Sequence, residues 1–173
     1  MNAIPPAGLS EFDPKLTEER LARLVRLAAR AFNRSLQMRL QTEGVTFGQW
    51  IFLRILWYND GLSQRELSQR AHLTEPTAHS ALTKLEKQGI ITREKMEGDK
   101  RTLQIYLTAK GQKLRDRLEP MARDVNILSL QGLEDDEVCT LRKGLLAIIR
   151  NLEADEKEAG VQGIKVPATR SSF

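Results

Sequence analysis

Apolar residues recur every three or four positions along most of this chain, which is the period of an amphipathic α-helix. Two short stretches, residues 90–96 and 102–107, are instead typical of strands, and the segment EGDKR between them supplies a tight turn. We therefore predict a mainly α protein with a small β-hairpin. The predicted helices cover residues 16–42, 46–58, 63–71 and 74–88, and two longer helices follow residue 108.

Residues that start and stop helices support these boundaries. The segments TFGQ (46–49) and SQRE (63–66) fit a capping box, in which a hydroxyl and a side chain three residues later bind each other's backbone N–H groups. Pro76 falls in a first turn, where a missing N–H costs nothing, and Gly89 is a typical stop. The helix over 46–58 is apolar nearly all round, so we expect it to be buried.

The two last helices each carry an apolar row whose steps alternate between three and four residues, as in coiled-coil packing. The rows are Leu114, Leu118, Met121, Val125 and Leu128, and then Val138, Leu141, Leu145, Ile148 and Leu152. A cysteine in such a packed row is usually inert, so we do not expect Cys139 to sense oxidants.

Composition narrows the class of protein. A net charge of +4 and an isoelectric point near 9.4 are compatible with a polyanionic partner. A single cysteine excludes an internal disulfide, and two histidines do not make a metal site, so we predict no metal and no cofactor. The chain has no Ser-His-Asp set or phosphate loop, which argues against an enzyme. It lacks a membrane-length apolar run and a signal-peptide pattern, so we expect a cytoplasmic protein.

The order short helix, turn, helix, hairpin describes a winged helix-turn-helix. With Ala78, Leu82 and Leu85 turned inward, the fourth helix presents small hydroxyls and lysines outward. Small hydroxyl side chains let a helix approach base edges in the major groove, and lysines reach phosphates. The outward and flanking residues are Pro76, Thr77, His79, Ser80, Thr83, Lys84 and Lys87. Taken alone, this helix is equally consistent with an ordinary polar surface.

The tip of the hairpin favours DNA binding. Lys100 and Arg101 put two cations on a projecting loop, where an arginine can enter the minor groove. Asp99 lies two residues before Arg101 and is well placed to orient the guanidinium group. A winged helix that serves only for protein contacts is a rival interpretation, and the basic tip argues against it.

Residues 62–111 resemble the MarR family of bacterial transcription regulators. LSQRELSQRAHLTEPTAHSALTKLEKQGIITR is similar to its helix-turn-helix, and GDKRTLQIYLTAKG is similar to its wing motif. In the wing motif an Asp-x-Arg is followed by Leu-Thr and then Gly, here Asp99, Arg101, Leu107, Thr108 and Gly111. With the flanking long helices, the resemblance covers about residues 15–155.

The resemblance implies a homodimer that is clasped by its terminal helices and reads a palindromic operator in double-stranded DNA. It divides the matched part into a helical dimerisation region (15–45 and 108–155) and a winged helix-turn-helix domain (46–107). The prolines and glycines near both ends predict a flexible arm (1–14) and a flexible tail (156–173). The expected DNA-binding residues are Ser63, Arg65, Thr74, Pro76, Thr77, His79, Ser80, Thr83, Lys84, Lys87, Asp99, Lys100 and Arg101.

Members of this family often release DNA when a small, frequently aromatic anion binds between the winged domain and the dimer helices. Trp50, Arg54 and Trp57 recur about one turn apart, so the arginine is a candidate for binding a carboxylate between two indoles. The alternative is that both tryptophans belong to the core and that Arg54 reaches solvent or a glutamate. A further stripe of arginines, which is a solvated face or a phosphate site, comprises Arg23, Arg26, Arg30 and Arg34.

These features lead to one function hypothesis with alternatives. We expect a repressor that binds its operator as a homodimer, does not cross a membrane, and is released by a small anionic effector or its coenzyme A thioester. An activator, a regulator without a ligand, and a protein-interaction module are the alternatives.

Overall fold

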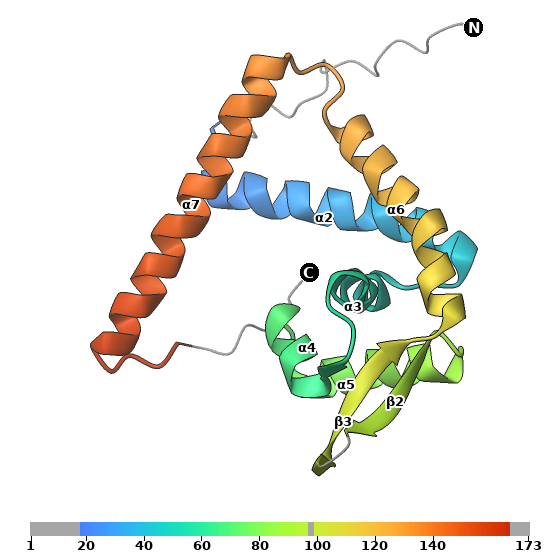
Figure 1. The fold of residues 1–173 in the computed structure, drawn as a ribbon. Coiled ribbons are helices and arrows are strands. Elements are labelled where there is room, and N and C mark those ends of the chain that lie inside the picture. Colours follow the sequence, from blue (N-terminus) through green and yellow to red (C-terminus); the bar gives the residue numbers. More distant parts are fainter. Residues whose placement is uncertain (1–17, 97–98, 167–173) are drawn as a thin grey trace, which may run out of the picture. The chain divides into compact units, whose positions relative to one another are not determined.

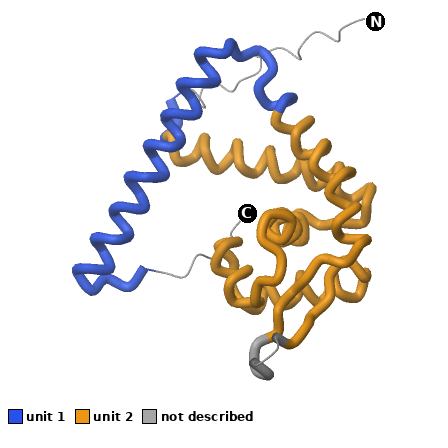
Figure 2. Tube along the Cα trace, in the orientation of Figure 1, with its two compact units in different colours: residues 1–20, 127–168 blue, residues 21–126, 169–173 orange. Residues whose placement is uncertain are grey.

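The computed structural model describes residues 18–96 and 99–166, and of these it describes residues 96 and 99–102 by their backbone only (Figure 1). The described residues fall into two compact units (Figure 2). The larger unit, which is unit 2 in Figure 2 and is called the first unit here, contains residues 21–126. The smaller unit, which is unit 1 in Figure 2 and is called the second unit here, contains residues 18–20 and 127–166. The predicted N-terminal arm lies outside the described residues.

The elements confirm a mainly helical fold with a small antiparallel sheet. The first unit contains α2 (Leu21–Leu40), η2 (Gln41–Glu43), α3 (Phe47–Tyr58), β1 (Leu62–Ser63), α4 (Gln64–Arg70), α5 (Glu75–Lys87), β2 (Ile91–Met96), β3 (Asp99–Leu107) and most of α6 (Ala109–Ser129). The end of α6 and the whole of α7 (Asp135–Val161) belong to the second unit.

Three boundaries differ from the sequence-based prediction. α2 begins at Leu21 rather than at residue 16, and β3 begins at Asp99 rather than at residue 102. α7 continues to Val161, so part of the expected flexible tail is helical. Gly160 does not stop this helix, because a single glycine costs a helix only about 1 kcal/mol relative to alanine. The chain turns out of the helix only near Gly163, which has a φ of 75°.

Both predicted capping boxes are present. At α3, Gln49 N donates to the Thr46 hydroxyl over 3.3 Å, and Thr46 N donates to Gln49 Oε1 over 2.8 Å. At α4, Glu66 N donates to the Ser63 hydroxyl over 3.2 Å, and Ser63 N donates to Glu66 Oε2 over 2.8 Å. These bonds satisfy N–H groups for which a helix has no internal partner, so they fix where both helices begin.

The sheet contains a third strand that the sequence pattern did not indicate. β3 lies between β2 and the two-residue β1, and both pairings are antiparallel. β1 pairs Leu62 with Ile105 and Ser63 with Gln104. A periodic pattern needs about four residues before it can indicate a strand, so β1 is too short to be seen. Its pairing joins the hairpin to the start of α4.

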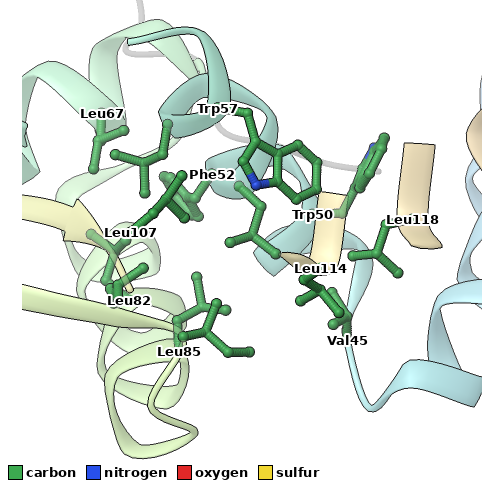
Figure 3. Close-up of a cluster of buried hydrophobic side chains, with 14 of the residues drawn as sticks. Val45, Trp50, Phe52, Trp57, Leu67, Leu82, Leu85, Leu107, Leu114 and Leu118 are labelled. Carbon is green, nitrogen blue, oxygen red and sulfur yellow. The ribbon is translucent and has the colours of Figure 1, made fainter. Parts of the chain in front are cut away.

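α3 lies in the hydrophobic core of the first unit, as its apolar composition predicted. Phe52, Leu53 and Leu56 are at most 1% exposed. Buried side chains from the surrounding elements pack in the same core, among them Leu67, Leu82, Leu85, Leu107, Leu114 and Leu118 (Figure 3). Full burial of such a side chain contributes about 1.5–3 kcal/mol. This core therefore holds α4, α5 and the hairpin on one scaffold.

Large apolar side chains remain exposed on the long helices. Among the described residues of α7 none is buried, and Leu146, Ile149 and Leu152 are each more than half exposed. In the first unit, Leu21 and Phe32 of α2 are likewise exposed. Exposed apolar rows of this kind mark interaction surfaces. In the described part of the chain, no helix is both long and apolar enough to cross a membrane.

Candidate nucleic-acid interface

α5 buries one side and exposes the other, as the sequence predicted. Ala78, Leu82 and Leu85 are fully buried. The opposite side is exposed at Pro76, Thr77, His79, Ser80, Lys84 and Lys87. Lys84 and Lys87 lie in the last turn, so the cations gather at one end of this face and the small polar residues at the other. This is the arrangement in which bases and phosphates can be contacted by different parts of one helix.

The start of α5 is set by a tight turn after α4. His72 has a φ of 52°, a left-handed conformation that non-glycine residues rarely adopt. Thr74 is the N-cap of α5, and its hydroxyl lies 2.9 Å from the hydroxyl of Thr77. His79 Nδ1 lies 3.2 Å from Gln64 Oε1, which links the exposed side of α5 to the first turn of α4.

The candidates on α4 differ in how free they are to contact DNA. The Ser63 hydroxyl donates to Glu66 Oε2 over 2.7 Å, so it already serves the helix cap. The hydrogen bonds from the Ser63 side chain and backbone lower the pKa of Glu66, because they stabilise its charged form. Arg65, in the first turn of α4, is exposed. Ser63 thus has an established structural role, whereas its contact with DNA stays a prediction.

Thr83 differs from the other candidates on α5 because a residue of the hairpin binds it. Arg93 on β2 donates from Nη2 to the Thr83 hydroxyl over 3.1 Å. The Arg93 Nε atom lies 3.2 Å from Glu86 Oε2, one turn further along α5. Sequence reasoning missed Arg93, because the pattern of a short strand does not reveal what lies across from it.

The hairpin of β2 and β3, hereafter the wing, lies beside α5 (Figure 1). The side chains of Asp99, Lys100 and Arg101 are outside the described residues, so the predicted pairing of Asp99 with Arg101 stays a prediction. The backbone of Asp99 begins β3 and pairs with Met96.

The remaining residues of the wing motif anchor the sheet and the end of α5. The Thr108 hydroxyl lies 2.8 Å from the carbonyl oxygen of Gly89, directly after α5. Lys110 Nζ donates to the carbonyl oxygen of Gln88 over 2.8 Å. A Cβ atom at Gly111 would collide with the carbonyl oxygen of Ile90. These contacts therefore fix the end of α5 against the sheet and the start of α6.

A cavity of about 610 Å³ in the first unit contains part of the predicted effector site. It is lined by Phe32, Asn33, Leu36, Phe47, Trp50, Ile51, Arg54, Ile55, Tyr58, Asn59, Arg70, Ala71, Ala122, Val125 and Asn126. Arg54 and Arg70 are the cationic members, and none of these residues, all within the described chain, is acidic. The sequence could not indicate Arg70, because it comes from α4 rather than from α3.

Other residues of the predicted effector site lie elsewhere. Trp57 does not line the cavity: it is 8% exposed, and its indole N–H donates to the carbonyl oxygen of Gly111 over 3.0 Å. Its ring packs edge-on against Trp50, with 5.5 Å between the centroids. Trp50, 3% exposed, belongs to the same core although it also lines the cavity, and Arg54 is exposed. The sequence-based alternative that both tryptophans are core residues and that Arg54 reaches solvent is therefore correct. The stripe Arg23, Arg26, Arg30 and Arg34 is also absent from the lining, and Cys139 is exposed rather than packed within the described chain.

A helix-turn-helix followed by a β-hairpin, with an exposed polar helix beside that hairpin, defines the class of winged helix-turn-helix proteins. The model of the MarR family matches residues 45–103. The HTH-type transcriptional regulator TtmR of Methylorubrum extorquens is 30% identical over 160 residues, which are 92% of this chain and 78% of that protein. The chain belongs to the MarR family of transcriptional regulators.

Solved structures agree with this assignment. A putative MarR family regulator from Listeria monocytogenes, in complex with a 26mer DNA, has a TM-score of 0.71 and 25% identity and covers 86% of this chain and 99% of its own. A MarR family protein from Mycobacterium tuberculosis, in complex with salicylic acid, has a TM-score of 0.62 and 26% identity, with coverages of 75% and 96%.

Proposed function

We propose that this protein regulates transcription by binding double-stranded DNA as a homodimer, with α5 in the major groove and the wing in the adjacent minor groove. The observation that carries this proposal is the exposed side of α5, where Ser80 precedes Lys84 and Lys87. The DNA complex of the Listeria relative supports it. In this arrangement Thr77, His79 and Ser80 read base edges, and Lys84, Lys87 and Arg101 bind phosphates or the minor groove.

The exposed apolar row of α7 supports the homodimer. Leu141, Leu145 and Leu152 belong to the coiled-coil-like row and are 49%, 38% and 59% exposed in the single chain. A second copy of α7 offers the same row, and two-fold interfaces are built from such self-complementary surfaces. A dimer of winged domains would read two half-sites about one helical turn of DNA apart.

The cavity supports regulation by a small anionic ligand. Apolar side chains such as Phe32 and Ile51 suit an aromatic ring, and Arg54 and Arg70 suit its carboxylate. The salicylic acid complex of the Mycobacterium relative favours the same class of ligand. Because Arg70 ends α4, a ligand bound there would act directly on the helix-turn-helix. Release from an operator by such a ligand would make the protein a repressor.

The DNA-binding proposal is tested by selecting duplexes from random sequence with the purified full chain. We expect an enriched palindrome whose logarithmic affinity falls linearly with the logarithm of salt concentration, by about 0.9 for each phosphate contacted. Fluorescence anisotropy with the selected duplex and a scrambled one measures both quantities. Equal binding to both duplexes, or no salt dependence, would refute sequence-specific DNA binding.

The ligand proposal is tested by titrating salicylate into the complex with the selected duplex. We expect salicylate to release the DNA. Arg54→Gln should raise the salicylate concentration needed for half-maximal release by about tenfold, because hydrogen bonds to charged groups contribute more free energy than bonds between neutral groups. Arg26→Gln, an exposed arginine outside the cavity, is the matched control and should respond as the wild type does. A normal response of Arg54→Gln would show that this cavity is not the effector site.

A further inference from the structure

Arg93 occupies a position in the sheet where an apolar residue would be expected. In the register of the wing it lies opposite Ile105, which is 1% exposed, so both side chains leave the sheet on its core side. Ile91, two residues earlier on the same side of β2, is also buried. A cation on this side must be compensated by polar partners, because an uncompensated charge is costly to remove from water.

The partners of Arg93 both belong to α5. Its Nη2 donates to the Thr83 hydroxyl over 3.1 Å, and its Nε lies 3.2 Å from Glu86 Oε2. The Nε atom is itself buried without an aligned hydrogen bond, so its attraction to Glu86 is that of an ion pair. Only 16% of the Arg93 side chain is exposed, whereas 40% of the Glu86 side chain is exposed. One guanidinium group therefore connects two turns of α5 to the edge strand of the wing.

We propose that Arg93 is a positioning residue that couples the recognition helix α5 to the wing, so that both enter their grooves together. This inference rests on the proposed DNA binding. Thr83 lies on the turn between Ser80 and Lys87, and Arg93 lies on the strand that leads to the wing tip. Fixing Thr83 and Glu86 to β2 fixes the separation between the base-reading face of α5 and the tip. DNA affinity then depends on Arg93 although Arg93 itself contacts no base.

The decisive experiment is a double-mutant cycle between the two halves of the interface. Lys84→Ala and Arg101→Ala are measured singly and together on the selected duplex, in the wild type and in Arg93→Met, which keeps the stem of the side chain. In the wild type, the loss of DNA affinity in the double variant should differ by about threefold or more from the product of the two single losses, as it does for sites linked by one network. In Arg93→Met we expect affinity to fall about tenfold and the losses to become additive.

Two further variants separate positioning from other roles. Arg93→Lys retains one cation but cannot span both partners, so it should recover only part of the affinity. The double variant Thr83→Val, Glu86→Gln removes both partners of Arg93 and keeps Arg93 itself. It should also abolish the non-additivity between Lys84→Ala and Arg101→Ala. The double variant also provides the measurement if Arg93→Met fails to fold.

The outcomes distinguish the possible roles. Wild-type affinity in Arg93→Met, or non-additivity that survives it, would overturn the inference. If Arg93 instead contacted a phosphate directly, Arg93→Met would lower the salt slope by about 1. The non-additivity between Lys84→Ala and Arg101→Ala would then stay unchanged. If the wild type selects no duplex at all, the proposed function itself fails, and this inference with it.

Discussion

Gly111 shows how a single residue sets the position of a whole element. Its backbone passes so close to the chain after α5 that a Cβ would collide with the Ile90 carbonyl oxygen and touch Leu107. The Thr108 hydroxyl accepts from Gly111 N over 3.2 Å, and Trp57 binds the Gly111 carbonyl oxygen. The start of α6 is thus attached to the end of α5 by contacts that only glycine permits at this position.

Gly111→Ala should therefore destabilise the fold. We expect a loss of about 1–3 kcal/mol in the free energy of unfolding, the usual cost of overpacking. Urea denaturation followed by circular dichroism measures it. Gly48→Ala is the matched control, since a Cβ there meets no atom within 4 Å, and it should leave stability unchanged or slightly raised. Equal stabilities of the two variants would contradict the close approach at Gly111.

At the scale of elements, α5 combines several attachments with one exposed polar face. Its core side packs through Leu82 and Leu85, and its C-terminal end is bound by Thr108 and Lys110. The buried Gln49 of α3 donates to Gln88 Oε1 over 2.9 Å, directly after the helix. A helix held at this many points presents its polar face with little freedom, as recognition by shape and hydrogen bonding requires.

The two ends of that exposed polar face should respond differently to mutation. Ser80→Ala should change the preference among duplexes that differ at one base pair, because a base contact carries sequence information. Lys84→Ala should weaken binding to all duplexes alike and reduce the salt slope by about 1, because it removes a phosphate contact. Anisotropy titrations over a set of single-base variants and three salt concentrations distinguish the two. A uniform loss for Ser80→Ala would count against base reading there.

At the scale of the whole molecule, the exposed apolar surface indicates an interaction with a second chain. α7 has no buried residue within the described structure, although its row of leucines and isoleucines is as regular as that of a buried helix. α7 also ends in a strongly polar stretch, Glu153 to Glu158, that suits a solvated end. Burial of this row between two copies would remove the apolar surface from water and pair the winged domains.

Leu145→Asp should convert the protein to a monomer. A two-fold interface contains each residue twice, so two aspartates would have to be buried and the free-energy cost of burying a charge would apply to both copies. Sedimentation velocity measures the mass, and affinity for the selected palindrome should fall about a hundredfold or more with the loss of the second half-site. Lys143→Asp changes a residue on the opposite side of the helix and should stay dimeric. A dimeric Leu145→Asp protein would exclude α7 as the interface.

The sequence alone determined what depends on neighbours within a few residues. Both capping boxes, the burial of α3 and the inward face of α5 follow from hydrogen bonds and periodicities inside one helix. The class of fold followed as well, because the order of elements and the wing motif are local features.

Only the tertiary structure decided which distant residues meet. It paired β1 with β3, brought Arg70 to the cavity of Arg54, placed Trp57 in the core and joined Arg93 to Thr83. None of these contacts leaves a periodic trace in the chain, because each depends on how separate elements pack against one another. Side-chain partners across elements are selected by that packing, and the packing is a property of the folded molecule as a whole.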